Sequence, residues 1–433
     1  MTRLAQALTL PCGATLSNRL CKSAMTEGLS DARLYANERH NNLYRQWSEG
    51  GAGLLITGNV MIDQRVMERP GNVAIDPAPA FRPGHEGFER LRAYAKAGTV
   101  AGNHLWMQIS HAGRQSPWYV AKQPLAPSDV QLDLMGNYRR PRAMREDEIL
   151  DFIQRYANVA RVAREAGFTG VQIHSAHGYL LSSFLSPVTN QRADEWGGSL
   201  ANRARFLLET LRAVRKAVGP DFPLSVKLNS DDFRKGGFEF GDCLQLVQWL
   251  NAESVDLLEV SGGTYEQPKL LGYEGRSEDA RPMRQSTQQR EAYFLEYAAA
   301  IRQVATMPIL MPGGFRHRAA MEAALESGDI DVIGLARPLC TEPDLPRRLL
   351  SGASQEAPAF EKSLKLGGGM FAPSSSNFVV KLINLLGQMG WYYAHIEDLA
   401  DGKPLKLQRG VFAAFVRYLK NEYRTAWRMQ RSQ

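Results

Sequence analysis

The amino-acid sequence predicts an α/β fold, a (β/α)8 TIM barrel followed by a C-terminal helical extension. Three observations lead to this prediction. Eight short apolar runs have the length and composition of buried parallel strands, and each is followed by a helical pattern. Polar residues gather where these runs end, which is where barrel enzymes carry their chemistry. We expect the barrel to span residues 1–352 and the extension residues 353–433.

The expected elements alternate along the chain. The strands are expected at 19–25, 53–58, 104–110, 171–179, 223–229, 256–261, 308–311 and 331–336. The helices are expected at 37–49, 86–97, 147–166, 202–218, 243–252, 290–305, 318–326 and 344–350. A doubly wound sheet, the alternative fold, would place a Gly-rich G-x-G-x-x-G turn after the first strand, and Met25-Thr26-Glu27-Gly28 does not match it.

The amino-acid composition is typical of a globular protein, and three features of the sequence bear on its cofactors and location. The four cysteines (Cys12, Cys21, Cys243 and Cys340) form no C-x-x-C pair, which disfavours a zinc site, an iron–sulfur cluster and a disulfide framework. The N-terminus lacks a signal-peptide pattern, and no run of about 18 apolar residues could cross a membrane. We therefore expect a cytoplasmic protein.

The C-terminal extension carries most of the surplus charge. Residues 353–433 contain 11 Lys and Arg against 6 Asp and Glu, within a formal net charge of +7 for the chain. A basic tail alone favours nucleic-acid binding only weakly, so we expect no nucleic-acid partner. Helices are expected at 378–393 and 411–427, after a Gly- and Ser-rich linker. They could dock on the barrel, dock on a partner subunit of a homo-oligomer, or adsorb to a membrane surface.

The fourth strand ends in His174, His177 and Tyr179. The two histidines could be zinc ligands, a base paired with a nucleophile, or paired donors to a substrate oxygen. Zinc would need a third ligand, and the strand ends offer neither a nearby carboxylate nor a cysteine. A serine nucleophile lacks its elbow motif. Paired donors, with Tyr179 as the proton source, would suit polarisation of a carbonyl, whereas a purely structural histidine pair remains the alternative.

Two further strands carry polar side chains. Lys227 lies within Leu224-Ser225-Val226-Lys227-Leu228, and a lysine facing the barrel interior would require an anion or a catalytic carbonyl. The alternative is a lysine that points outward between helices. Gln108 at the end of the third strand would suit an amide-like heterocycle edge or an ordinary core hydrogen bond.

The ends of the last two strands predict a phosphate site. Gly313 and Gly314 follow the seventh strand, and Ala336 and Arg337 end the eighth. Barrels commonly bind phosphate here, because glycine lets backbone N–H groups approach an anion and arginine adds a bidentate charge. Glycines that merely cap a strand are the alternative for Gly313 and Gly314.

A longer pattern surrounds the two histidines. It reads His174-Ser175-Ala176-His177-Gly178-Tyr179-Leu180, then Phe184-Leu185-Ser186-Pro187, Asn190-Gln191-Arg192-Ala193-Asp194-Glu195-Trp196-Gly197-Gly198-Ser199 and Asn202-Arg203. This pattern resembles the old yellow enzyme family of FMN-dependent ene-reductases. The resemblance covers about residues 5–352, includes His111-Ala112-Gly113-Arg114, and leaves the extension outside.

The resemblance implies a role for each site residue. His174 and His177 would hold the electron-withdrawing oxygen of an activated alkene, and Tyr179 would be the proton donor. Residues implied to bind FMN are Ala24, Met25, Thr26, Gly58, Gln108, Lys227, Gly313, Gly314, Ala336 and Arg337, with Thr26 at the flavin O4 edge and Lys227 beside N1 and O2.

The resemblance also implies a reaction. NADH or NADPH would reduce bound FMN, which would pass hydride to a small electrophilic alkene, an α,β-unsaturated carbonyl or nitro compound. Loops 111–145 and 262–288 are candidate lids, with Tyr138 or Tyr265 facing substrate. Rival interpretations are a barrel that binds FMN or a phosphate ligand as a sensor or scaffold, and a phosphate-barrel lyase that uses Lys227 as a Schiff base.

Three positions depart from the family pattern. Lys227 stands where the family usually has arginine, which keeps the charge but loses the planar fork. Ala24 replaces a common proline and Ala336 a common glycine. No cysteine cluster follows the barrel, so we expect no iron–sulfur relay.

Overall fold

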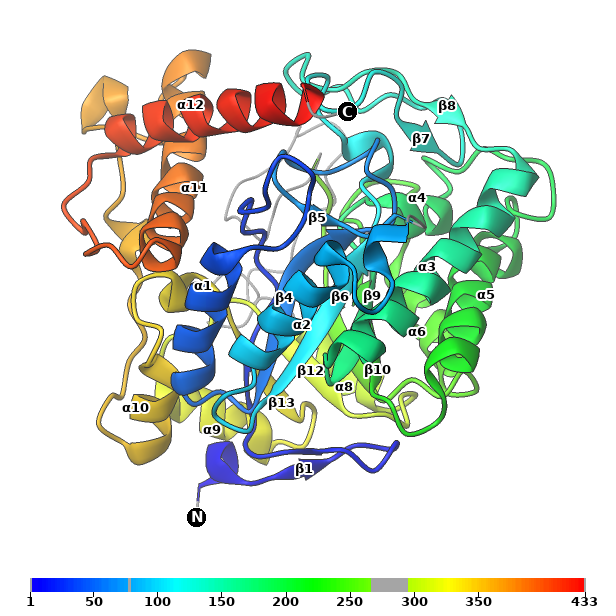
Figure 1. Cartoon of the computed structure of the whole chain (residues 1–433), viewed down its shortest axis with the longest axis horizontal. Coiled ribbons are helices and arrows are strands. Elements are labelled where there is room, and N and C mark those ends of the chain that lie inside the picture. Colours follow the sequence, from blue (N-terminus) through cyan, green and yellow to red (C-terminus); the bar gives the residue numbers. More distant parts are fainter. Residues whose placement is uncertain (1, 77–78, 266–294, 432–433) are drawn as a thin grey trace.

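A closed barrel of eight parallel strands forms the body of the protein (Figure 1). The computed structural model describes residues 2–76, 79–265 and 295–431. The barrel strands are β3 (Leu20–Lys22), β4 (Leu54–Met61), β6 (His104–Ser110), β9 (Gly170–Ser175), β10 (Leu224–Asn229), β11 (Leu257–Ser261), β12 (Ile309–Pro312) and β13 (Val332–Leu335). Each strand pairs with its neighbours in parallel, and pairing of β13 with β3 and of β3 with β4 closes the ring. The predicted (β/α)8 barrel is confirmed.

The lower half of the barrel interior is apolar. Side chains that point inward from six strands form one buried cluster: Cys21, Leu54, Ile56, Trp106, Leu257, Leu310 and Val332. An N-terminal antiparallel hairpin, β1 (Leu8–Thr9) with β2 (Thr15–Leu16), adds Leu8, Leu10 and Leu16 to this cluster. The hairpin lies beneath the barrel in Figure 1, so it closes the end at which the strands begin.

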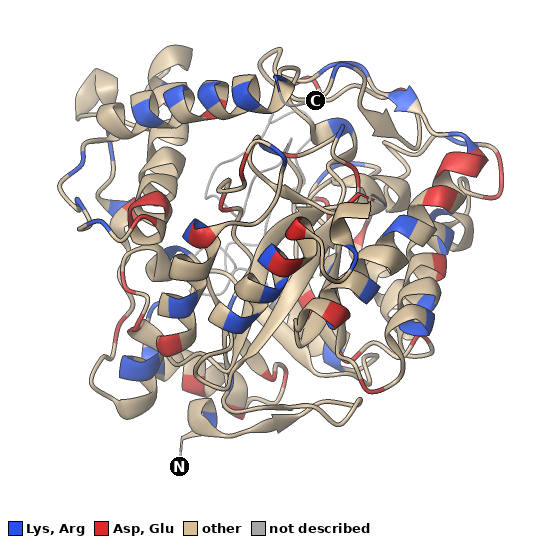
Figure 2. Ribbon diagram, in the orientation of Figure 1, with Lys and Arg blue, Asp and Glu red and all other residues tan. Residues whose placement is uncertain are grey.

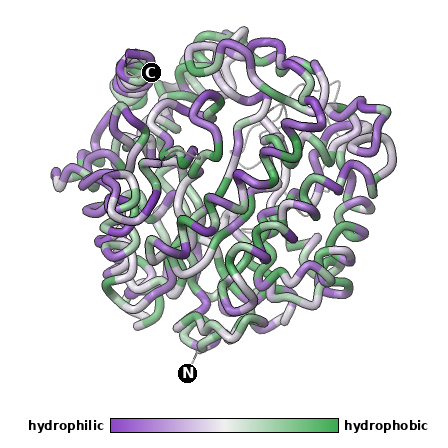
Figure 3. The backbone as a smooth tube through the Cα atoms, turned by 45° about the vertical axis from the view of Figure 1, so that its right-hand side comes forward, coloured by the Kyte–Doolittle hydropathy of each residue, from purple (hydrophilic) through white to green (hydrophobic). Residues whose placement is uncertain are grey.

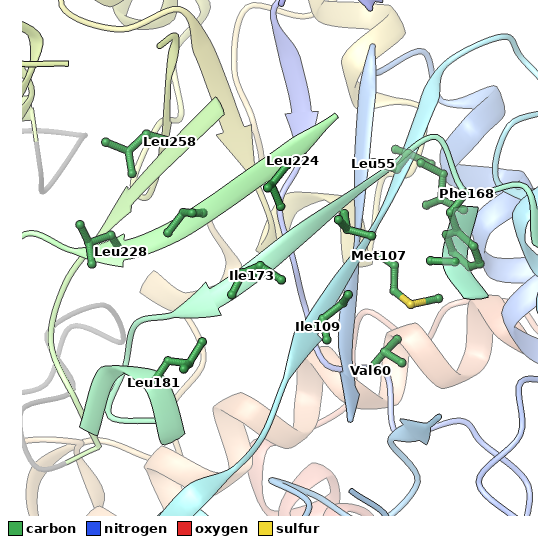
Figure 4. Close-up of a cluster of buried hydrophobic side chains, with 14 of the residues drawn as sticks. Leu55, Val60, Met107, Ile109, Phe168, Ile173, Leu181, Leu224, Leu228 and Leu258 are labelled. Carbon is green, nitrogen blue, oxygen red and sulfur yellow. The ribbon is translucent and has the colours of Figure 1, made fainter. Parts of the chain in front are cut away.

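The outward side chains of the same strands pack against the surrounding helices. Figure 4 shows this layer, with Leu55 of β4, Met107 and Ile109 of β6, Ile173 of β9 and Leu228 of β10 fully or almost fully buried. The alternation follows from the two-residue period of a strand, which sends successive side chains to opposite faces. Residues next to these in sequence, such as Gln108, Gln172 and Lys227, therefore face the barrel interior.

The helices surround the barrel. They are α1 (Glu38–Glu49), α2 (Glu86–Ala97), α3 (Glu146–Ala166), α4 (Leu180–Leu185), α5 (Leu200–Val218), α6 (Phe240–Leu250), α8 (Leu295–Arg302), α9 (Arg318–Glu326) and α10 (Leu345–Ser351). Figure 3 shows hydrophilic and hydrophobic segments alternating along them, as expected for helices with one face on a core. Among the described residues, no helix is long and apolar enough to cross a membrane.

Several predicted bounds are wrong. β4 continues through Gly58 to Met61, with a bulge between Ile56 and Asn59 that lets the strand pass the glycine. The first strand is shorter than expected, because the chain leaves the barrel after Lys22. Four short features were not predicted: the helix α4, the N-terminal hairpin, β5 (Val73–Ala74), and the parallel pair β7 (Leu125–Ala126) with β8 (Arg142–Ala143). Of these, β5 extends the sheet beside β4. Residues 290–294 of the expected helix 290–305 lie outside the described residues.

The extension is a helical hairpin docked on the barrel. Its helices are α11 (Phe378–Ala400) and α12 (Val411–Gln430), both longer than predicted. α11 packs on α1, where Gln46 Nε2 donates to the Leu399 carbonyl at 3.0 Å and Arg39 Nε lies 2.6 Å from Asp401 Oδ1. α12 runs across the end of the barrel opposite the N-terminal hairpin (Figure 1), and Figure 2 shows basic residues recurring along it. Of the three arrangements considered, the structure shows docking on the barrel of the same chain.

Candidate active site

A polar layer lies above the apolar half of the barrel interior. Gln108 Nε2 donates to Gln172 Oε1 at 2.7 Å, and Gln172 Nε2 donates to Glu259 Oε2 at 2.8 Å. Glu259 Oε1 lies 2.9 Å from the Lys227 ammonium nitrogen. These four side chains come from β6, β9, β11 and β10 and are buried. The fold therefore brings together residues that the sequence separates by up to about 150 positions.

Lys227 points into the barrel, which excludes the alternative in which it points outward. The anion that it meets is Glu259, a residue of the protein itself. Burial of this lysine therefore does not by itself imply a negative ligand or a catalytic carbonyl, although the sequence alone suggested one of the two. Glu259 was missed, although Leu257-Leu258-Glu259-Val260 offers the same signal as Lys227, namely a charge in the middle of a buried strand.

His174, His177 and Tyr179 converge directly above this layer. The ring centroids of His174 and His177 are 5.1 Å apart, and those of His174 and Tyr179 are 4.8 Å apart with nearly perpendicular rings. His177 adopts a left-handed backbone (φ +63°), which a non-glycine residue rarely does, and Asn229 Oδ1 accepts its backbone N–H at 3.1 Å. This turn places three side chains from six consecutive residues on one side of the site.

The hydrogen bonds of His174 fix its tautomer. Its Nδ1 accepts the backbone N–H of Ala176 at 3.2 Å, so in the neutral ring the hydrogen is on Nε2. His177 Nε2 lies 2.7 Å from the Ser261 hydroxyl oxygen. Burial, helped by the charge of Lys227, holds the pKa of both histidines well below the ordinary value. Both rings are therefore neutral near pH 7, and His174 presents one N–H donor.

Tyr179 occupies the N-cap position of α4 and is surrounded by oxygen atoms. Its hydroxyl donates to the Glu68 carboxylate through Oε2, and its oxygen lies 2.8 Å from that of Tyr265. Because the single hydrogen of Tyr179 goes to Glu68, Tyr265 is the donor in the second contact. Burial, and then the negative charge of Glu68, raise the pKa of the Tyr179 phenol well above the ordinary value.

Glu68 is the main residue that sequence reasoning missed. It lies in the segment after β4, and its carboxylate also accepts the Thr26 hydroxyl and, at 2.6 Å, the Asn59 amide. Glu68 lies outside the strand ends, which were the positions considered when a third zinc ligand was sought. Even so, the described residues include no group of three or more His, Cys, Asp or Glu that could hold a metal ion.

The candidate lid residues also meet here. Tyr265 contacts Tyr179 directly, and the Tyr138 ring lies against that of Tyr265 with 6.3 Å between centroids. Loop 111–145 thus reaches the site through Tyr138. Of the other candidate lid, only residues 262–265 are described, and the rest of 262–288 lies outside the described residues.

Gly58 sits where the chain leaves no room for a side chain. A Cβ atom at this position would lie 2.5 Å from the Met25 carbonyl oxygen and 2.2 Å from a Glu27 carboxylate oxygen. The backbone N–H of Gly58 donates to Glu27 Oε1 at 2.8 Å. Ala24 and Met25 follow β3 on the neighbouring strand, with Met25 Sδ 3.5 Å from Cys340 Sγ. The chain after β3 and strand β4 thus approach each other so closely here that only glycine fits.

The predicted phosphate turns lie at the ends of β12 and β13. Gly313 and Gly314 have φ values of +106° and +86°, a conformation that favours glycine. Arg337 begins a short 3-10 helix directly after Ala336. Its guanidinium lies 3.8 Å from Glu361 of the extension, which also pairs with Arg316 and accepts the Tyr392 hydroxyl at 2.6 Å. Burial raises the pKa of Glu361, but Arg337 and these partners bring it below the ordinary value.

These features fit FMN. The glycine pair and Arg337 match an anion at the ends of β12 and β13, and Gln108 and Lys227 lie inside the barrel as polar partners for a heterocycle.

The extension closes over the loop that carries Glu68. The next residue, Arg69, forms a buried ion pair with Glu422 of α12. Its guanidinium carbon lies 3.7 Å from the centroid of the Tyr393 ring of α11 and 5.5 Å from that of Tyr418. At the end of α12, Met429 Sδ accepts the N–H of Gly71, and Gln430 Nε2 donates to the Tyr119 carbonyl at 2.9 Å. Both helices of the extension therefore contact the loops at the barrel mouth.

The chain is similar in sequence to known flavin oxidoreductases. The sequence profile of the NADH:flavin oxidoreductase / NADH oxidase family matches residues 8–356. The NADH-dependent flavin oxidoreductase iccE of Talaromyces variabilis is 35% identical over 367 residues, which are 80% of this chain and 86% of that protein.

Two solved structures are similar over most of the chain. The old yellow enzyme homologue of Zymomonas mobilis is 27% identical, with a TM-score of 0.68 over 83% of this chain and 95% of that one. A 2-naphthoyl-CoA reductase, solved with 2-naphthoyl-CoA, is 26% identical, with a TM-score of 0.72 over 81% of this chain. This chain spans 52% of that second protein.

Proposed function

The chain belongs to the NADH:flavin oxidoreductase / NADH oxidase family, which includes the old yellow enzymes, and from this premise we propose that it is an ene-reductase. As in the family, its cofactor is FMN and its reductant is NADH or NADPH. The proposed substrate is a small activated alkene whose double bond is conjugated to a carbonyl or nitro group. Bound FMN would supply hydride transfer, first from the nicotinamide and then to the β-carbon of the alkene.

The proposed role of His174 and His177 is to hold the substrate oxygen. The Nε2–H of His174 would donate to the carbonyl or nitro oxygen, and His177 would be held beside it by Ser261 and Asn229. Negative charge builds up on that oxygen as the β-carbon receives hydride, so donors fixed in advance lower the barrier. Neutral rings suit this role, since each keeps one N–H without adding a full charge.

The proposed role of Tyr179 is to protonate the α-carbon. Its ring stands nearly perpendicular to that of His174, with 4.8 Å between the centroids, so the phenol lies beside the histidine proposed to hold the substrate oxygen. Its raised pKa keeps the phenol protonated at neutral pH, as a proton donor requires.

The remaining predicted residues are assigned to FMN. Arg337 and the backbone at Gly313 and Gly314 would hold the phosphate, while Ala24, Met25, Thr26 and Gly58 would border the ring. Lys227 would place positive charge beside the flavin, with Glu259 and Gln172 setting its position. A lysine whose side-chain nitrogen is engaged by a buried carboxylate is not free to attack a carbonyl, which disfavours the lyase alternative.

The division of the chain into a barrel, 1–352, and an extension, 353–433, is part of the proposal. The family profile ends at residue 356, and both α11 and α12 lie beyond it.

The observation that carries the proposal is the convergence of two neutral histidines and a protonated tyrosine above a lysine inside the barrel. To test it, the purified yellow protein is mixed anaerobically with NADH or NADPH, and the visible flavin absorbance is followed. Bleaching followed by recovery on addition of 2-cyclohexen-1-one would support the proposal. A protein that binds no flavin would contradict it, and a flavin that does not bleach would favour a sensor or scaffold.

A further inference from the structure

The Glu68 carboxylate touches three polar side chains of the site at once. It accepts the hydroxyl hydrogens of Thr26 and Tyr179 and an amide hydrogen of Asn59. Only about 9% of the Glu68 surface is exposed, so these protein groups replace most of its hydration. A buried carboxylate in contact with the group proposed as proton donor can control where the hydrogen of that donor points.

In the hydrogen-bonding pattern described above, Tyr179 gives its only hydrogen to Glu68. A protonated Glu68 would reverse this bond, because a carboxylic acid donates to the phenol oxygen and leaves the phenol hydrogen free to point elsewhere. Tyr265 already donates to the Tyr179 oxygen, which can accept two hydrogen bonds. The substrate side is then the remaining direction for the hydrogen of Tyr179.

We propose that Glu68 is a positioning residue for Tyr179, which turns the phenol hydrogen toward the substrate and returns a proton to the phenol oxygen after transfer. The proposal rests on the proposed function. The proton balance closes without another reactant: the α-carbon takes a hydrogen from Tyr179, Tyr179 takes one from the Glu68 carboxyl, and Glu68 takes one from water. Without this return, Tyr179 would remain a buried tyrosinate, a charge that burial disfavours.

The extension holds Glu68 in place through the next residue. Arg69 is 7% exposed and Glu422, its partner on α12, is 3% exposed. Stacking of the guanidinium on Tyr393 fixes the arginine further. The extension thus holds the side chain of Arg69, and the side chain of the preceding residue, Glu68, points to Tyr179. The negative charge of Glu68 acts on five nearby titratable side chains, which are Tyr138, Tyr179, Tyr265, Tyr393 and Glu422.

The first test compares Glu68→Gln with Glu68→Asp in the two half-reactions of the FMN-loaded enzyme. Glutamine keeps the shape but has no acid to give, whereas aspartate is shorter but keeps the carboxyl group. Flavin reduction by NADH is measured first in each variant, so that the alkene step is compared with it. Flavin reoxidation by 2-cyclohexen-1-one should slow by about 10²-fold in Glu68→Gln and by less in Glu68→Asp, because acid catalysis typically contributes that much.

Combining Glu68→Gln with Tyr179→Phe separates this role from general damage. If Glu68 acts through Tyr179, the double variant is no slower than Tyr179→Phe alone. If the two substitutions slow the alkene step by factors that multiply in the double variant, the inference is overturned. Equal alkene rates in the wild type and Glu68→Gln would also overturn it. A wild type that accepts hydride from NADH but reduces no alkene would instead overturn the proposed function and this inference with it.

A second measurement does not depend on turnover. In protein labelled with 13C at the tyrosine Cζ, the Tyr179 signal is identified by its loss in Tyr179→Phe. It should move in Glu68→Gln, because the phenol no longer donates to a carboxylate. An unmoved signal would contradict the contact.

A matched pair of variants tests whether the extension positions Glu68 through Arg69. Glu422→Gln removes the partner of Arg69, whereas Glu397→Gln breaks an ion pair with Arg417 that lies within the extension. The Tyr179 signal and the alkene half-reaction should change in Glu422→Gln and stay as in the wild type in Glu397→Gln. The same response in both variants would overturn the positioning role of the extension.

Discussion

Lys227 on β10 and Glu259 on β11 form an ion pair inside the barrel, with 2.9 Å between Nζ and Oε1. The two residues face each other in the strand register, and Gln172 donates to the second carboxylate oxygen. The charge next to the proposed flavin is therefore already balanced by the protein. Both the stability of the barrel and the affinity for FMN should depend on it.

Replacement of this lysine should destabilise the protein. Lys227→Met leaves Glu259 buried without its partner, so the free energy of unfolding should fall by about 3–5 kcal/mol. Urea denaturation would measure this fall, and dialysis would measure weaker FMN retention. In the double variant Lys227→Met with Glu259→Gln, which keeps the acceptor for Gln172, most of the stability should return while FMN retention stays weak. Retention equal to that of the wild type would place the lysine outside the flavin site.

Tyr179→Phe should separate the two halves of the reaction. The variant loses the hydroxyl but keeps the ring, so flavin reduction by NADH or NADPH should stay near normal. Alkene reduction should slow by ~10²-fold or more, since a positioned proton donor contributes at least that much. Stopped-flow absorbance of the flavin reports both steps. Unchanged alkene turnover would rule out Tyr179 as the proton donor.

Loss of both histidines should abolish binding of a phenolate. Phenols that stack on oxidised flavin would place their oxygen where His174 and His177 are proposed to hold the substrate oxygen, and the long-wavelength absorbance of such complexes gives their Kd. Losing one oxygen donor typically costs ~10²–10³ in rate at comparable sites, so His174→Ala alone should slow alkene turnover by that factor. Undiminished phenol binding in His174→Ala with His177→Ala would mean that the pair faces elsewhere.

Gly58→Ala should weaken FMN binding. The added Cβ would lie 2.5 Å from the Met25 carbonyl oxygen, so the backbone on one side of the proposed ring site must move. Gly241→Ala in α6 is the control, because no atom lies within 4 Å of its added Cβ and alanine favours a helix. FMN release measured by fluorescence should rise only in the first variant. Equal FMN release from both variants would show that the backbone at Gly58 does not border the cofactor.

Stability should decrease at acidic pH because of His40. Burial, with the charge of Arg39, lowers its pKa from 6.5 to about 3 in the folded protein. Below pH 6.5, His40 therefore binds a proton in the unfolded chain but not in the folded one. The contribution of this group to the unfolding free energy is fully present above that pH and is lost as the pH falls. Between pH 7 and pH 5 this one group should cost about 2 kcal/mol of unfolding free energy.

The matched variant is His40→Gln. The glutamine oxygen can still accept the backbone N–H of Asn37, as His40 Nδ1 does at 3.3 Å in the capping box of α1. The variant loses the ring contact with Tyr94 at every pH, but its unfolding free energy should decline less between pH 7 and pH 5. Parallel curves from urea denaturation at the two pH values would contradict the assignment.

Much of the barrel could be predicted because its strands depend on local patterns. Each strand is a short apolar run, and the residues just past its end must share one face of the closed sheet. This reasoning placed His174, Tyr179 and Lys227 in one site from sequence alone. It also depended on the family resemblance for their roles, since geometry alone left several alternatives open.

Glu68 could not be predicted for a physical reason. It lies in an irregular segment between β4 and β5, without the period of a strand or helix, and its position depends on Arg69 and on helices more than 300 residues later. The bulge in β4 at Gly58 was missed because the strand passes a residue that usually ends one. Glu259, by contrast, could have been found, since the rule applied to Lys227 applies to it equally.

The closure of the barrel joins the two ends of its sequence. Leu20 of β3 pairs with Ile333 of β13, so the ring cannot form until the chain beyond residue 333 has left the ribosome. Until then β3 has no neighbour on the side where β13 will pair, and this exposed edge can pair with other chains. Contacts between residues so distant in sequence also fold slowly. Synthesis in the cell should therefore depend on chaperones more than the stability of the finished barrel would suggest.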